Sequence, residues 1–511
     1  MSFRQDRTNP STAVSNWKGR TDTPKAWPST RVATWMNGGL FGASESSWVM
    51  EVIAATTAGT HANFYIGDVK TNPHDGKTYI SGFWDNYYGG GYQYDYGPLV
   101  GQLKDDGSAD LEWWTMCWYN STTYRAIGQH PQLSFAPSSS DVYVGSRFER
   151  GSTGCMWARF NSSGTLQNAS NAYTFPGGGG LYKIVTDGTN VISIGNGAVG
   201  GYTRFIGVRW PYDSANAAAT AGRYGYTSWT SGSDAPSDGA TYYTNGGTGH
   251  AYGFPKDYNG YMGRLMKVPM DASNMETALF TGFGTQGTLG IQGDGANTAG
   301  LAFSGYPTYF GMINASTPSI SWSKTLTASS GSVQIANDAA PYIDPDGNVY
   351  AFGQDDSKGF IIKLDSSGTV LWQRWLTVST AAGSNTSEIY SVGGNQDGTM
   401  VYASMYVNSL QYGGSGATKF PRMVVWKIKA DGSDDGSATI DNSSGTGGGD
   451  EDVFTIAASS ITVHAGSVGI GAWATPSGGG ASASHQNDPL VAVTPWSGNS
   501  NLPVLAAENL A

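Results

Sequence analysis

The sequence predicts an all-β fold made of seven similar units. The clearest unit spans residues 341–376, where short stretches of alternating apolar residues are separated by turns such as Asp365-Ser-Ser-Gly368. The turn before the second strand of this unit recurs at spacings of 48 to 64 residues, at Gly76, Ser140, Gly188, Gly246, Gly295, Gly347 and Gly398. A phrase from the second half of the unit also recurs, in residues 100–107, 156–166, 320–326 and 425–432.

Each unit is predicted to be a small antiparallel meander with one apolar face. Such a meander is too small to bury that face alone, so it needs neighbours of the same kind. A period near 50 residues is typical of one small sheet in a repeat architecture. The units around Val208 and Lys267 are degenerate copies.

A family resemblance follows from the phrases DGNVYAFG (346–353), FIIKLDSSGTVLWQRWL (360–376) and ISWSKTL (320–326). They resemble the bacterial β-propeller repeat and its quinoprotein-like relatives, over about residues 66–440. The resemblance implies one four-stranded blade per unit and thus a seven-bladed β-propeller. It implies no particular chemistry, because a fold of this kind hosts many functions.

We expect three regions: an N-terminal arm (1–45), the β-propeller (46–440), and a linker with a short β segment and an extended C-terminal arm (441–511). A propeller must close its ring, because open sheet edges invite pairing with other chains. Residues 48–53 resemble the outer-strand phrases, so we expect them to pair with the unit that contains Trp426; residues 452–456 are the alternative. The two arms carry spaced apolar anchors such as Trp17 and Val491, and either dock on a neighbour or are disordered.

Composition excludes several classes of function. The net charge is −11, from 28 basic and 39 acidic residues, and no basic run is present, which argues against direct binding of nucleic acid. No stretch approaches 18 apolar residues, so we expect no membrane span. Only two cysteines occur, Cys117 and Cys155, and we expect both to be buried free thiols.

The surface chemistry indicates where the protein works. Charged residues make up only 13% of the chain, so neutral polar side chains must provide its solubility, as in long-lived extracellular assemblies. The first residues nevertheless lack the apolar core of a secretory signal. A virion protein, made in a host cytoplasm and released by lysis, reconciles the two observations.

One stretch is a candidate contact surface. Residues 85–97 carry five tyrosines among four glycines: Tyr87, Tyr88, Tyr92, Tyr94 and Tyr96. Tyrosine offers contact area with few rotatable bonds and a hydroxyl group, which suits binding to a sugar or a subunit. The alternative is a loop that folds onto the rim of the propeller.

No catalytic residues, metal ligands or cofactor are predicted. The six histidines have no metal-ligand spacing, and no nucleophile elbow is present. Paired acids, as at Asp105-Asp106, fall in turns or linkers, where solvated carboxylates are expected. Asp344-Pro-Asp346-Gly-Asn348 is predicted to be a hairpin turn and not a calcium loop, since it lacks that loop's glycine and glutamate.

Three classes of function remain after this reading. The first is a structural, non-enzymatic component of a tailed-bacteriophage particle, in the tail or its tip. Its partners would be other virion proteins, further copies of itself around the tail, and a host surface glycan. The second is a carbohydrate-active tailspike enzyme, and the third is a bacterial surface propeller or dehydrogenase.

Overall fold

The computed structural model describes the backbone of the strands and of several turns. These residues are 4–7, 26–33, 48–56, 61–88, 93–105, 111–121, 132–136, 139–149, 153–169, 173–174, 181–199, 202–211, 223–226, 234–245, 248–257, 264–269, 276–279, 288–293, 300–305, 309–314, 319–326, 333–334, 341–355, 358–376, 387–395, 397–411, 419–440, 461–464, 467–474 and 488–494. Side chains are described mainly in 68–81, 100–105, 133–145, 157–168, 183–195, 309–326, 341–375, 392–403 and 426–433, with gaps.

The described strands form eight antiparallel sheets, numbered here along the chain. Sheet 1 contains β4 (His61–Thr71), β5 (Thr78–Tyr88), β6 (Gln93–Leu103), β7 (Leu111–Ser121) and β1 (Arg4–Arg7). Sheet 2 contains β8 (Gln132–Phe135), β9 (Val142–Glu149), β10 (Thr153–Phe160), β11 (Leu166–Ala169) and β12 (Tyr173–Thr174). Sheet 3 contains β13 (Leu181–Thr186), β14 (Asn190–Val199), β15 (Tyr202–Pro211) and β16 (Arg223–Tyr226). Sheet 4 contains β17 (Asp234–Asn245), β18 (Thr248–Asp257), β19 (Arg264–Pro269) and β20 (Glu276–Leu279).

The remaining sheets follow the same order. Sheet 5 contains β21 (Thr288–Gly293), β22 (Gly300–Gly305), β23 (Tyr309–Asn314) and β24 (Ser319–Thr325). Sheet 6 contains β25 (Val333–Gln334), β26 (Tyr342–Ile343), β27 (Val349–Asp355), β28 (Lys358–Leu364) and β29 (Val370–Leu376). Sheet 7 contains β30 (Ser387–Gly394), β31 (Met400–Gln411), β32 (Lys419–Lys429) and β33 (Asp434–Ile440). Sheet 8 contains β34 (Ile461–His464), β35 (Ser467–Ala474), β36 (Asp488–Thr494), β3 (Trp48–Thr56) and β2 (Ala26–Ala33).

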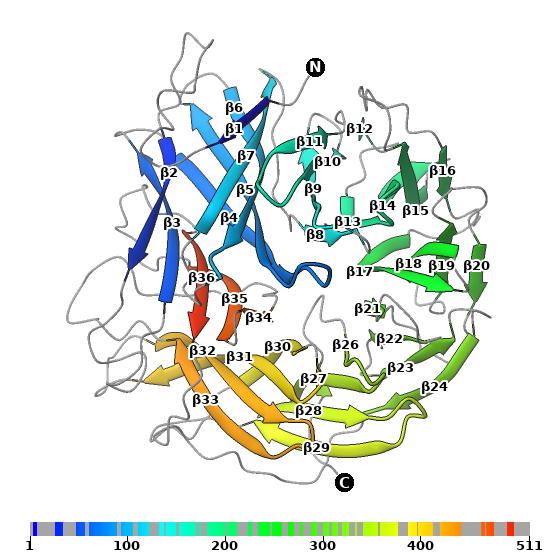
Figure 1. Ribbon diagram of the computed structural model, residues 1–511. Coiled ribbons are helices and arrows are strands. Elements are labelled where there is room, and N and C mark those ends of the chain that lie inside the picture. Colours follow the sequence, from blue (N-terminus) through cyan, green and yellow to red (C-terminus); the bar gives the residue numbers. More distant parts are fainter. Residues whose placement is uncertain are drawn as a thin grey trace.

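The sheets are arranged around a central axis (Figure 1). The first strand of each sheet is innermost, and these strands contact one another in the order β4, β8, β13, β17, β21, β26 and β27, β30, β34 and again β4. Each sheet thus packs one face on the sheet before it and the other on the sheet after it. The all-β prediction is confirmed, with one small meander per repeat.

Seven of the sheets correspond to the seven predicted units. The turn residues at Gly76, Gly188, Gly347 and Gly398 lie between the first two strands of their sheets and have positive φ. Ser140 lies in the same place in sheet 2. Gly246 and Gly295 are outside the described residues, although the strands that flank them pair as predicted.

The count of seven is not confirmed, because both ends of the chain together build an eighth sheet. β3 pairs with β36, with Met50 opposite Val491, so a strand from the first 56 residues lies beside one from the last 24 (Figure 1, blue β3 beside red β36). The expected pairing of residues 48–53 with the sheet of Trp426 is wrong. That sheet already has its own outer strand, since β33 pairs with β32.

The expected domain boundaries also divide segments that belong to the sheets. Within the region predicted as an N-terminal arm, β1 extends sheet 1 through β7 and β2 extends sheet 8 through β3. Within the region predicted as a C-terminal arm, β36 is the middle strand of sheet 8. Residues 452–456, the alternative closing strand, are outside the described residues.

A repeated contact between tryptophan and glycine joins neighbouring sheets. Trp322 of β24 lies against Gly368 in the β28–β29 turn, and its Nε1 donates to the carbonyl of Ser366 at 2.9 Å. Trp372 of β29 contacts Gly432 of sheet 7 in the same way. A third copy joins Trp113 of sheet 1 to the turn at Gly164 in sheet 2. In all three turns the glycine has a positive φ, and only a residue without Cβ leaves room for the indole.

Candidate functional site

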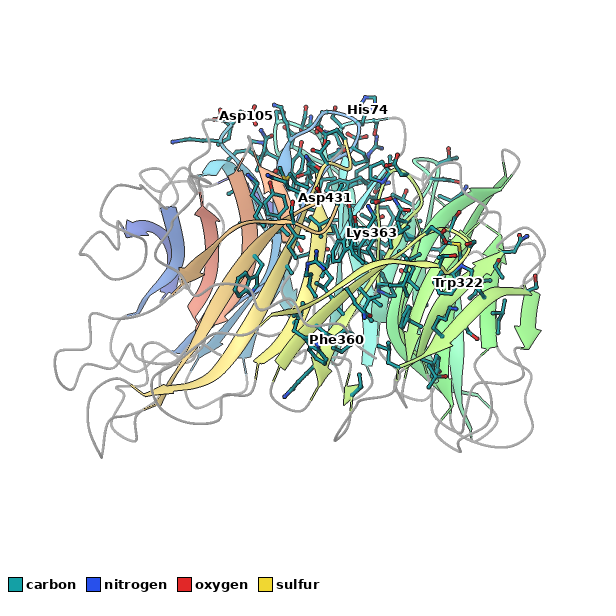
Figure 2. All side chains as sticks on the ribbon, turned by 90° about the horizontal axis from the view of Figure 1, so that it is seen from below. His74, Asp105, Trp322, Phe360, Lys363 and Asp431 are labelled. Carbon is teal, nitrogen blue, oxygen red and sulfur yellow. The ribbon has the colours of Figure 1, made fainter. Side chains whose placement is uncertain are left out.

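The best-defined polar cluster lies in sheet 6, near the end of the ring that carries the β28–β29 turn. Asp344 is 1% exposed and Lys363 is 4% exposed. The Lys363 Nζ lies 3.3 Å from Asp344 Oδ2, and the Tyr350 hydroxyl donates to the same oxygen at 3.2 Å. In Figure 2, Lys363 lies below the face that carries His74, Asp105 and Asp431, whereas Phe360 lies toward the opposite face.

Every described group in this cluster has a partner. The backbone amides of Asp346 and Asn348 donate to Asp344 Oδ1, as does the Asn348 side chain. Lys363 also donates to the carbonyl of Ala430 in the next sheet, at 3.3 Å. Donors therefore surround the Asp344 carboxylate, which supports the predicted hairpin turn over a calcium loop.

The same positions recur in other sheets with different residues. A tyrosine on the second strand faces a polar residue on the third: Tyr79 and Gln102, Tyr143 and Arg159, Tyr350 and Lys363, Tyr402 and Lys427. In sheet 2 Arg159 pairs with Asp141 and lies 5.9 Å from the centre of the Tyr143 ring. In sheet 1 the pair is neutral, because Asn72 and Gln102 stand where sheet 6 has Asp344 and Lys363. Repetition with interchangeable chemistry indicates a structural role for these clusters.

Burial keeps the tyrosines of these clusters neutral. It raises the pKa of Tyr143 to about 12, although the nearby Arg159 opposes the shift. The pKa of Tyr350 is raised further, by burial first and then by the charge of Asp344. Tyr79 and Tyr342 are raised for the same reasons, with Asp75 and Asp344 as the neighbouring charges. A general base or nucleophile would need a pKa moved toward neutrality, and these shifts move away from it.

The acids in the outer turns serve their own backbone. Asp365 Oδ1 accepts from the amides of Ser367 and Thr369, and hydrogen bonds with those residues lower the pKa of Asp365. Asp397 and Asp431 have lowered pKa values for the same reason, with Thr399 and Ser433 as their first donors. Within the part of the chain that the structure describes, no group of three or more His, Cys, Asp or Glu could hold a metal ion. In that same part, no helix is long and apolar enough to cross a membrane.

The tyrosine-rich stretch is not a separate loop. Tyr87 and Tyr88 end β5, while Tyr94 and Tyr96 lie near the start of β6, and the two strands pair up to Tyr88 and Gln93. The prediction of a glycine-hinged loop is therefore wrong for these four residues. Tyr92 is outside the described residues.

The strand register separates the tyrosines into two groups. Tyr87 lies opposite Tyr94, and Tyr96 lies opposite Tyr119 of β7. Because opposite and alternate residues share a face, these four tyrosines lie on one face of sheet 1. Tyr88 lies on the other face. We call the group of Tyr87, Tyr94, Tyr96 and Tyr119 the tyrosine face.

Sequence reasoning missed Tyr119 as a member of this face. It interpreted Tyr119 as core, since it follows the apolar run from Trp113 to Trp118. The alternation of β7 contained the signal, but it became readable only once the register with β6 was fixed.

The ring of small antiparallel sheets, each with its first strand innermost, defines the class of the protein as a β-propeller. No protein-family model matches the chain, and no curated protein matches it. Solved structures that resemble it are β-propeller or WD40 domains. The β-propeller domain of Myceliophteria thermophila Cps50 (Swd1) has a TM-score of 0.39 and 10% identity, over 74% of this chain and 100% of that one. The WD40 domain of SCAP from fission yeast has 0.39 and 9%, over 85% and 96%.

The WD40 domain of Toxoplasma gondii coronin gives a similar result, with a TM-score of 0.38 and 10% identity over 75% of this chain and 89% of that one. Likenesses at this level carry no information about function. The β-propeller part of the sequence resemblance is confirmed by the sheet order itself, and the quinoprotein-like part stays a prediction.

Proposed function

We propose that the eight sheets are blades of one closed ring, and that this ring is a structural component of a tailed-bacteriophage particle. It would lie in the tail or its tip, pack on other virion proteins and touch the host surface. The observation that carries the proposal is the eighth sheet, in which β3 and β36 place both ends of the chain side by side. Chain ends are where local unfolding and proteolysis usually begin, so pairing them favours persistence outside a cell.

The use of the buried polar groups supports a structural role. In the described residues, Asp344 and Lys363 join two sheets, and Asp68 with Lys70 join sheet 1 to the backbone of Leu133 in sheet 2. These groups hold sheets together and carry no pKa suited to catalysis. A non-enzymatic scaffold accounts for them without further residues.

A contact surface for a neighbour is offered by the outer strand of sheet 6. Val370 and Leu371 of β29 are 47% and 51% exposed, and they are the exposed large hydrophobics of the described part. Counted from the docking tryptophan of each strand, Leu371 stands where β24 has Ser321 and β7 has Glu112. An apolar side chain where sister strands are polar favours contact with another virion protein or another copy of this chain.

Mass spectrometry of purified particles tests the proposal. We expect this chain in particles produced by a lysing host that carries the gene, at a fixed copy number relative to the other virion proteins. Leu371→Glu should lower incorporation at unchanged solubility, whereas Ser321→Glu, at the matching position of sheet 5, should not. Absence of the wild-type chain from particles would contradict the proposal and favour the carbohydrate-active enzyme or the bacterial surface propeller.

A further inference from the structure

We propose that the tyrosine face of sheet 1 binds a neutral hexose polymer. This inference rests on the proposed function, because it names the chemistry of the host-surface contact. It is carried by three properties of the strands: the register that assembles the tyrosines, the length of sheet 1 relative to its neighbour, and the absence of cationic residues among the positions around them.

The register gives the tyrosines a compact arrangement across three strands. Tyr87, Tyr94 and Tyr119 come from β5, β6 and β7, and Tyr96 lies two residues along β6 from Tyr94. Directly opposite residues in such strands are about 5 Å apart, and alternate residues are about 7 Å apart along the strand. Four aromatic residues thus occupy an area that spans about two hexose units.

Sheet 1 extends past sheet 2 at this end. The face that carries the tyrosines also carries Tyr79 and Val100, which pack with residues of sheet 2 in one core cluster. β5 continues nine residues beyond Tyr79, whereas β9 continues six beyond its counterpart Tyr143. Three residues correspond to about 10 Å of strand. The described strands of sheet 2 therefore end before Tyr87 and Tyr94, so the tyrosine face continues past them.

The other positions on this end of the face are suited to hydroxyl groups. His61 lies opposite Tyr87, and Asp85 lies opposite both Asn63 and Tyr96. Ser121 lies opposite Tyr94. Imidazole, carboxylate, amide and hydroxyl groups donate to or accept from sugar hydroxyls, while aromatic rings pack on the apolar faces of pyranose rings.

Charge selects the class of glycan. None of these positions is Lys or Arg, so nothing on this end of the face would pair with a phosphate, sulfate or uronate group. Asp85 is the single carboxylate among them, and retaining and inverting glycosidases use two. The arrangement fits binding of a neutral polymer without its hydrolysis.

The test uses the purified full-length chain and four immobilised probes: maltohexaose, cellohexaose, mannohexaose and, as the charged control, polygalacturonate. We expect at least one neutral hexamer to bind, without release of shorter sugars. Tyr87→Ala and Tyr94→Ala should each weaken binding about tenfold, and Tyr94→Phe should weaken it less than threefold because the ring remains. Tyr88→Ala is the matched control, since Tyr88 neighbours Tyr87 in the chain but lies on the opposite face; it should change affinity less than twofold.

Several results would overturn the inference. These are no binding to any neutral hexamer at millimolar concentration, binding to polygalacturonate alone, or equal losses for Tyr88→Ala and Tyr87→Ala in variants with wild-type melting temperatures. Association of the tyrosine face with another virion protein in place of glycan would overturn it as well. Because the assay uses the isolated chain, failure here leaves the particle assignment to its own test by mass spectrometry.

Discussion

Replacing Gly368 with alanine should destabilise the protein by an amount that the geometry of its turn specifies. Gly368 has a φ of 83°, and a Cβ added there would lie 2.6 Å from Cδ2 of Trp322. Gly76 has a similar φ of 71°, but an added Cβ would meet nothing within 4 Å. The two substitutions therefore share the backbone strain and differ in the steric clash.

The expected magnitudes follow from these two terms. A non-glycine residue in the left-handed region costs about 1 kcal/mol, which is the whole effect expected for Gly76→Ala. Gly368→Ala must also displace the indole of Trp322. That movement breaks the hydrogen bond to Ser366, worth about 1 kcal/mol, and disturbs the packing of Trp322 on Phe310, for about 1 kcal/mol more. We expect a total loss of about 3 kcal/mol for Gly368→Ala.

The assay is equilibrium unfolding in urea, followed by tryptophan fluorescence and by circular dichroism. A double-mutant cycle isolates the contact: in a Trp322→Ala background, Gly368→Ala should cost no more than Gly76→Ala does. Equal losses for Gly368→Ala and Gly76→Ala in the wild-type background would refute the reasoning, because the contact between sheets 5 and 6 would then contribute nothing measurable.

Two further predictions concern the buried polar groups. Lys363→Gln should cost about 3 kcal/mol, because it leaves the Asp344 carboxylate buried without its cation, whereas the double variant Asp344→Asn/Lys363→Gln, which copies the neutral pair of sheet 1, should cost less; a double variant as unstable as the single one would contradict the matching of these positions. Raising the pH should destabilise the protein through Tyr143, since its folded pKa of about 12 lies above the ordinary value near 10. The neutral form is favoured on folding, so this contribution is complete below pH 10 and is lost as the pH rises toward 12; Tyr143→Phe should flatten the fall in urea midpoint across that window, and an unchanged slope would contradict the assignment.

The sequence predicted the repeating part of the fold because the local signals there are strong. Turns such as those at Gly347 and Gly368 need a positive φ, which marks them in the chain, and the strands between them alternate cleanly. The polar cluster of Asp344 and Lys363 was not predicted, since it depends on which residues stand opposite each other across strands.

The eighth sheet could not be predicted in the same way. Its strands come from 26–33, 48–56 and 461–494, and no local pattern indicates which strand pairs with which over more than 400 residues of intervening chain. The phrase at Trp48 did show that an outer strand was present. Its register is informative as well: Trp48 lies opposite Val493, one residue from the end of β36, much as Trp372 lies opposite Lys363 near the end of β28.

The most direct test of the closed ring is a cross-link between the two ends of the chain. In a background with Cys117 and Cys155 replaced by serine, the pair Met50→Cys and Val491→Cys should form an intramolecular disulfide on mild oxidation, because these positions are opposite in the β3–β36 register. The control pair Met50→Cys and Thr439→Cys tests the pairing with sheet 7 that the sequence suggested, and should not cross-link. An efficient cross-link in the control pair, or only intermolecular disulfides in the first pair, would contradict a ring closed by both ends of the chain.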